Sequence, residues 1–403
     1  TRIDSGIARD AFTRVVRADP KRDGLLYAGT ETGMWVSMDD GANWESFQLN
    51  LPIVPITDLV VKNDDLIVAT QGRSFWVLDD LTMLHQWSES KLAFEAWLFD
   101  PRPTYRLRGG RREGSLTEGT NPHPGVVLHY HLREDLPEDG SLSLEILDAD
   151  REPIRTLIHK PAGEDEDGGS DRHPTDPEPV LERSAGTHRY IWNLRYPGVF
   201  RFDGLINWGG GLNGPRAVPG TYHIVLKRND EVVGDTTVEL LMDPRSESDL
   251  AGLQEQFDFL MQIRDKATET HEAIARIREV RKQIQAVYQR AEGHSSHDAL
   301  KAAGDALLDD LKVIEETLYQ TKSRSNQDPL NFPIRLNNKL TALGGTASMG
   351  DFRPTAQSYG VYEYLVEKID AELAKLAAIE AERIPAFNIL VASQEIPAIP
   401  PRD

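Results

Sequence analysis

The segment from Ser37 to Trp44 constrains the fold of this chain more than any other stretch. It reads Ser-Met-Asp-Asp-Gly-Ala-Asn-Trp, the pattern S-x-D-x-G-x-x-W, within a run of alternating apolar and polar residues. Asp39 and Asp40 can accept hydrogen bonds from nearby backbone N–H groups, and Gly41 can take a positive φ angle. Trp44 can fold back as an apolar plug. The pattern predicts a tight acidic β-turn whose structural residues are Ser37, Asp39, Gly41 and Trp44.

Residues 1 to about 90 read as two rounds of short strands separated by turns. Residues 66–70 repeat residues 26–30, and the 40-residue spacing from Thr30 to Thr70 is typical of β-propeller blades. We therefore predict the last blades of a propeller, about two, over residues 1–95. Two blades cannot close a ring that uses roughly four to eight. The expected partner is the rest of the propeller, lying before Thr1 or on another chain.

The middle of the chain predicts a second β-domain. Residues 96–124 read as a connector, and residues 125–245 then resume the alternation with six or seven short strands. Antiparallel strands of this length and spacing predict an immunoglobulin-like β-sandwich. An acidic loop over 163–182 and an aromatic, glycine-rich loop over 196–216 interrupt it.

The last third of the chain changes to a helical period. Apolar residues spaced by three and four predict an antiparallel helical bundle over 246–385, followed by an extended tail over 386–403. A capping box over 246–249 begins the first helix, and Gly344-Gly345 ends the third. The expected helices cover 250–290, 296–319, 334–343 and 355–383.

Composition excludes several classes of function. The chain has 403 residues, enough for two to four domains, and its net charge is −20. Such acidity argues against nucleic acid and anionic membranes as partners, because both require a basic surface. The absence of cysteine excludes disulfides, thiolate metal sites and cysteine nucleophiles. No apolar run approaches the ~20 residues of a membrane span.

Two side chains are candidates for ligand binding. Arg73 lies in a Gln-Gly-Arg-Ser turn, where it could face the central channel of a propeller and bind a carboxylate ligand there. It could equally form a salt bridge with Asp79 or Asp80. Trp208 lies in the aromatic loop, where it could stack on a sugar or pack against the propeller or the bundle.

No metal or cofactor site is predicted. His129 and His131 have a spacing that could chelate zinc, but the sequence offers no obvious third ligand nearby. Gly209-Gly210-Gly211 lacks the Lys-Ser/Thr that a phosphate-binding loop requires. The sequence also assigns no catalytic residue.

The acidic turn and the segment Gln71 to Asp80 resemble the end of bacterial BNR/Asp-box proteins, which are sortilin-like or sialidase-like and are often labelled glycosyl hydrolases. The remaining sequence, including Asp328 to Leu340, is similar to their C-terminal extension. The resemblance implies export to the periplasm or the cell exterior. It favours a non-catalytic binding protein whose ligand is a peptide, a protein or a glycan. The alternative is a glycoside hydrolase or sialidase with its active site mostly in other blades, so enzymatic activity stays open.

Overall fold

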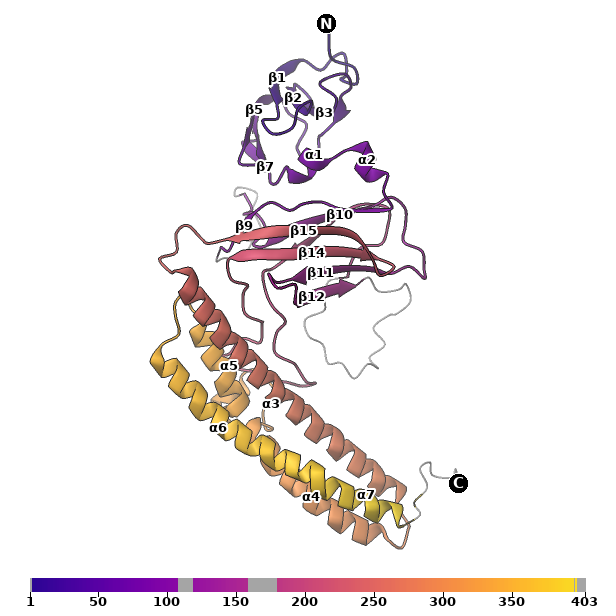
Figure 1. The fold of residues 1–403 in the computed structure, drawn as a ribbon, viewed down its shortest axis with the longest axis vertical. Coiled ribbons are helices and arrows are strands. Elements are labelled where there is room, and N and C mark those ends of the chain that lie inside the picture. Colours follow the sequence, from indigo (N-terminus) through magenta and orange to yellow (C-terminus); the bar gives the residue numbers. More distant parts are fainter. Residues whose placement is uncertain (1, 108–118, 159–179, 395, 397–403) are drawn as a thin grey trace. The chain divides into compact units, whose positions relative to one another are not determined.

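The structure, a computed structural model, describes residues 2–107, 119–158, 180–394 and 396. These residues form two compact units. Of the described residues, the first unit holds 2–107, 119–158, 180–193 and 219–243, and the second holds 194–218 and 244 onwards. All of the strands in the described residues belong to the first unit, whereas helices α3 to α7 belong to the second (Figure 1). The prediction of several domains, β first and then α, is confirmed.

Residues 13–78 form two antiparallel sheets. The first sheet has the order β1 (Thr13–Ala18), β2 (Leu26–Thr30), β3 (Gly33–Ser37) and β4 (Glu45–Ser46). The second sheet has the order β5 (Ile56–Lys62), β6 (Asp65–Thr70) and β7 (Phe75–Leu78). Two short helices that the sequence did not predict follow, α1 (Thr82–Gln86) and α2 (Glu89–Leu92).

The first and second sheets share one hydrophobic core. Because successive side chains of a strand point to opposite faces, every second one lies on the inner face. The inner faces contribute Val15, Tyr27, Met34 and Val36 from the first sheet and Ile56, Leu59, Leu66 and Val68 from the second. The sheets approach most closely at Gly29, where an added Cβ atom would lie 2.5 Å from Ile56 Cγ2. Only a residue without a side chain fits there.

Two further sheets complete the first unit. One has the order β13 (Gly186–Trp192), β10 (Val126–Leu132) and β8 (Ala96–Leu98). The other has the order β12 (Pro153–Ile158), β11 (Leu142–Leu147), β14 (Gly220–Arg228), β15 (Glu231–Leu241) and β9 (Thr104–Tyr105). Trp192 packs edge-on against Tyr222 with ring centroids 5.1 Å apart, which joins the two sheets. Strands β8 and β9 fall in the predicted connector, so that segment is part of the β-structure.

The second unit is helical. It contains α3 (Leu250–Arg290), α4 (His297–Leu318), α5 (Leu336–Ala347), α6 (Ala356–Ala378) and α7 (Ile384–Ala392), with a 3₁₀ turn at Asp328–Leu330 and a π-helical turn at Ile379–Arg383. Figure 1 shows α3 and α6 running side by side. The helices of this unit share one hydrophobic core, which includes Phe259 and Ile274 of α3, Leu311 of α4 and Ile369 of α6.

Three details of the helical region differ from the sequence expectation. Helix α3 begins with Asp249 as its cap, whose Oδ1 accepts from Gly252 N–H at 2.6 Å, so the predicted capping box does not form from Ser246. Helix α5 continues through Gly344 and Gly345 instead of ending there. Helix α7 occupies part of the predicted tail, because a proline such as Pro385 is tolerated in the first turn of a helix.

The loop 194–218 connects two strands of the first unit but belongs to the second unit. Its Val199 and Phe202 are buried in the helical core. Among the described residues, no helix combines the length and the apolar character needed to cross a bilayer.

Replacing Gly29 with alanine should destabilise the first unit by about 1–3 kcal/mol, because the methyl group overpacks the contact with Ile56 and Val15. Urea unfolding followed by tryptophan fluorescence measures the change. The matched control is Gly360→Ala on α6, where an added Cβ meets nothing within 4 Å. That variant should keep or raise stability by up to about 1 kcal/mol. Equal stability of Gly29→Ala and the wild type would contradict the close approach.

Candidate functional site

The acidic turn between β3 and β4 is closed by its own side chains. Ser37 Oγ accepts from Gly41 N–H at 2.9 Å and donates to Asp39 Oδ1 at 2.8 Å. Hydrogen bonds from the side chain and backbone of Asn43 lower the pKa of Asp39. Gly41 has φ of 84°, and Trp44 is buried with its Nε1–H donating to Ile3 O at 2.7 Å. These residues hold a turn, and their acceptors are occupied.

The Arg73 side chain is exposed in the turn between β6 and β7. Its carbonyl accepts from Trp76 Nε1–H at 3.0 Å, which fixes the backbone of the turn. Within the described part of the chain, its guanidinium makes no ion pair with Asp79 or Asp80. Asp80 instead accepts from Thr82 and lies 3.9 Å from Arg102 Nε. Arg73 is therefore available to an anionic ligand.

Trp208 lies in the helical unit and is half exposed. Its backbone N–H donates to Asn338 Oδ1 at 2.9 Å, and its carbonyl accepts from Asn338 Nδ2. Because both backbone groups bind one buried amide on α5, the loop is held against the helices. The structure thus places Arg73 and Trp208 in different units.

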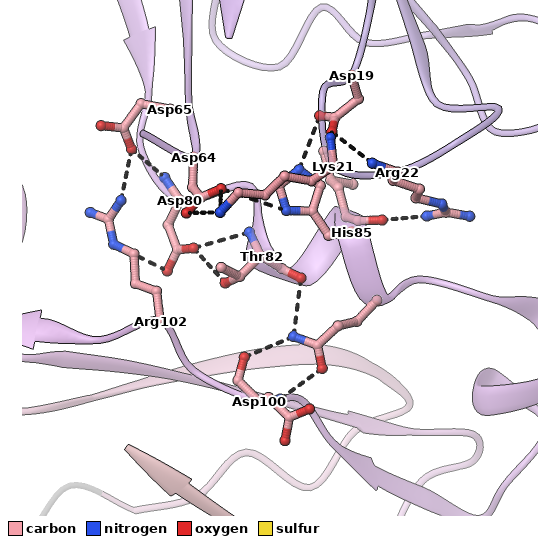
Figure 2. A network of polar contacts seen from close by, with 12 residues as sticks. Asp19, Lys21, Arg22, Asp64, Asp65, Asp80, Thr82, His85, Asp100 and Arg102 are labelled. Carbon is pink, nitrogen blue, oxygen red and sulfur yellow. Dashed lines mark hydrogen bonds and ion pairs between the residues drawn. The ribbon is translucent and has the colours of Figure 1, made fainter. Parts of the chain in front are cut away.

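A dense polar network lies around helix α1 and includes a buried carboxylate, Asp19 (Figure 2). Asp19 accepts from the backbone N–H groups of Lys21 at 2.8 Å and Arg22 at 3.1 Å. It also accepts from Tyr27 OH at 3.1 Å and lies 3.0 Å from His85 Nε2. The turn after β1 is thereby tied to α1.

The second sheet joins the same network through its hairpin turn. Lys21 Nζ lies 2.6 Å from Asp64 Oδ1, and His85 Nδ1 lies 3.9 Å from that same oxygen. Leu81 N–H donates to Asp64 O at 2.7 Å at the start of α1. Figure 2 shows His85 between Asp19 and Asp64, so one imidazole faces a carboxylate from each sheet.

The network extends to the segment that follows α2. Arg102 Nη1 donates to Asp65 Oδ1 at 2.9 Å, and that oxygen also accepts from Asp80 N–H at 2.9 Å. Gln86 exchanges two hydrogen bonds with the backbone of Asp100, at 2.8 and 2.9 Å. These contacts fasten the strands β5 to β7, helix α1 and the segment leading to β9 to one another.

The electrostatics of the network favour a structural role, in which Asp19 holds the neighbouring segments together, over a catalytic one. Burial alone would raise the pKa of Asp19, but hydrogen bonds from Lys21 N–H, His85 and Arg22 N–H outweigh it and hold that pKa below its usual range. Burial raises the pKa of Tyr27, which therefore stays a neutral donor to Asp19. Both ring nitrogens of His85 face carboxylates, so the charge of Asp19 is used to hold neighbouring groups.

No group of three or more histidine or acidic side chains among the described residues could hold a metal ion. His131 Nδ1 lies 3.1 Å from Thr187 Oγ1, and burial lowers the pKa of both His129 and His131. These half-buried imidazoles belong to strand packing.

The outward face of the second sheet is apolar and exposed. The register places Val60, Ile67 and Val77 in one row and Ala69 and Phe75 in a parallel row. Phe75 is 74% exposed, Val77 53% and Val60 48%. We call these five residues the outward face. Their side chains form a continuous apolar patch on three neighbouring strands.

The internal repeat relates this outward face to a buried one. Tyr27, Gly29, Met34 and Val36 of the first sheet correspond to Ile67, Ala69, Phe75 and Val77 of the second. The four residues of the first sheet are buried, and they form the face that packs on the second sheet. The second sheet therefore presents outward the same kind of face that the first sheet buries.

Comparisons with known proteins add no assignment: no protein-family model, no curated protein and no solved structure matches the chain. The resemblance to Asp-box proteins stays a prediction.

Sequence reasoning missed the network of Asp19, Asp64 and His85. Its members are 21 or more residues apart in sequence, and α1 is only five residues long. One local signal was present, since Asp80 precedes the helix-forming run at Thr82 and accepts from Thr82 N–H at 3.1 Å.

Replacing Asp19 with asparagine should lower the free energy of unfolding at pH 7 by about 2 kcal/mol, because buried donors lose a charged acceptor. The pKa of Asp19 is lower in the folded state than in the unfolded one. Its stabilisation is therefore present above the unfolded pKa of about 4 and is lost as pH falls through the lower folded pKa.

The difference between the wild type and Asp19→Asn should consequently shrink below about pH 4. Urea titrations at pH 7 and pH 3 measure it. The control, Asp58→Asn, removes an exposed carboxylate that pairs with Arg17 and should cost less than about 0.5 kcal/mol. A difference for Asp19→Asn that does not depend on pH would rule out the charged acceptor.

Proposed function

We propose that this chain is a non-catalytic interaction protein of the Asp-box propeller type, whose ligand is a peptide, a protein or a glycan. In this proposal the first and second sheets are the last blades of a propeller, the sheets of residues 96–241 form an immunoglobulin-like sandwich, and α3 to α7 form an antiparallel bundle. The observation that carries the propeller architecture in this proposal is the exposed outward face of the second sheet.

The outward face favours a partner on energetic grounds. Burying a valine or phenylalanine side chain stabilises a structure by roughly 1.5–3 kcal/mol. Burial of Phe75, Val77 and Val60 against a partner would therefore add several kcal/mol of stabilisation that is absent while they face water. Contiguous exposed apolar surface of this kind marks interaction sites in proteins.

The repeat supports one kind of occupant for the outward face. The first sheet packs on the second through a face that recurs on the second sheet, so the stacking is head to tail. Head-to-tail contacts leave a free face at the end of the stack unless a ring closes. The occupant that fits the outward face is therefore another antiparallel sheet of the same kind, which supplies the remaining blades.

A crosslinking experiment tests this occupant, and the absence of native cysteine makes it specific. Val77→Cys carries a benzophenone label on the outward face, and Asp23→Cys carries the same label on an exposed turn of the first unit. We expect Val77→Cys, and not Asp23→Cys, to crosslink in an extract of the producing cells. The captured peptide should itself contain short strands with the S-x-D-x-G-x-x-W pattern.

A second variant separates binding from folding. Phe75→Ser combined with Val77→Thr changes two exposed positions and should alter the free energy of unfolding by less than about 0.5 kcal/mol. The same pair of changes should abolish the crosslink from a label at Val60→Cys. Capture of helical peptides alone, or equal capture by the label at Asp23→Cys, would contradict the proposal.

Arg73 makes no ion pair within the part of the chain that the structure describes, and this favours a second candidate, a glycoside hydrolase or sialidase whose active site is completed by further blades. Arginine binds the carboxylate of an acidic sugar through paired hydrogen bonds. In that case Arg73→Ala in the assembled protein should reduce cleavage of a fluorogenic sialoside at least about tenfold, which corresponds to one charged hydrogen bond. Arg9→Ala, at another exposed position, is the control. Unchanged cleavage in Arg73→Ala would remove this residue from the mechanism.

A further inference from the structure

The helical unit contains a cavity of about 750 Å³, a size suited to a small organic ligand. Its walls come from residues 204–206 of the aromatic loop, from α3, from α4 and from the turn after α4. Leu205, Ile206 and Leu308 give it an apolar side. The rest of the lining is mostly charged.

The charge of the cavity differs from that of the chain. Its lining includes four cationic side chains, Arg278, Arg281, Lys312 and Arg324, against three anionic ones, Asp309, Glu315 and Glu316. The whole chain has 45 Lys and Arg against 65 Asp and Glu. A local excess of cations in an acidic protein is a distinct feature of this site.

The buried carboxylate in the cavity is already neutralised. Glu315 is 2% exposed, and its Oε1 accepts from Arg278 Nε at 2.8 Å. Its Oε2 is paired with Arg281. The Arg278 guanidinium also lies 4.6 Å from the Phe202 ring and 5.2 Å from the Tyr319 ring, and it donates to Asp203 O at 2.9 Å. This guanidinium is held rigidly, and Glu315 does not compete for the other cations.

Two further cationic side chains of the lining, Lys312 and Arg324, have donors that could bind a ligand. Lys312 is exposed and has no ion pair within the described residues, although Asp309 and Glu316 lie one turn away on either side. Arg324 uses Nη1 on the carbonyls of Thr321 and Ser323 at 2.7 and 3.1 Å, which leaves its other donors.

We propose that this cavity binds a small organic anion, whose carboxylate or phosphate meets Lys312 and Arg324 and whose apolar part lies on Leu205, Ile206 and Leu308. Lysine and arginine donors of this kind are the usual partners of both anions. The cavity belongs to the helical unit alone, so its occupancy is tested separately from the outward face.

Isothermal titration calorimetry of the full chain with phenyl phosphate and with phenylacetate tests the site. We expect saturable binding of at least one probe, weakened by added NaCl because the contacts are ionic. Tighter binding of phenyl phosphate assigns a phosphate ligand, and tighter binding of phenylacetate assigns a carboxylate. Absence of saturable binding by both probes would overturn the proposal.

Charge reversal at matched positions locates the binding. Lys312→Glu should weaken the better probe at least about tenfold, the effect of one charged hydrogen bond. Lys282→Glu makes the same charge change at an exposed position of α3 that does not line the cavity, and it should change affinity less than about twofold. Equal weakening by the two variants would overturn the assignment to this cavity.

Discussion

The contact between the first and second sheets is the constraint on which the rest of the N-terminal structure depends. Neither sheet has a hydrophobic core of its own, and isolated sheets of three or four strands need a covered face to be stable. Gly29 permits the close approach, because a side chain there would collide with Ile56. Asp19 and His85 then fix the turn after β1 and helix α1 at one end of the two sheets. The apolar contact therefore sets the distance between the sheets, and the polar network sets how they are aligned.

The sequence predicted elements whose signals are local. The stripe of apolar residues spaced by three and four located α3 over residues 250–290, because that spacing alone defines one helix face. The alternation in β10 likewise predicted a strand with every second residue buried. The acidic turn was predicted for the same reason, since Ser37, Asp39 and Gly41 lie within five residues of one another.

Features decided by distant contacts were not predictable. Helix α5 passes through Gly344 because its backbone packs against Ile263 of α3, where a Cβ atom would lie 3.2 Å from Cγ2, and tertiary packing of this kind overrides helix propensity. The loop 194–218 reads as an interruption of a β-domain, yet Phe202 and Asn338 make it part of the helical unit. Of the candidate site residues, Arg73 and Trp208 were named for their type, whereas the Asp19 network and the cavity at Glu315 require the fold.

The two proposed sites use opposite chemistry, and this explains why each suits its own ligand. The outward face is apolar and flat, so it gains stability by removing area from water and accepts an occupant of matching shape. The cavity at Arg278 is a partly open hollow lined mostly by charged groups, so it discriminates by the number and direction of its donors. The contacts of Arg278 and Arg281 with the buried Glu315 hold one wall of this hollow in place. An acidic chain repels anions at long range. Binding of a small anion at the proposed site therefore depends on short-range contacts with Lys312 and Arg324.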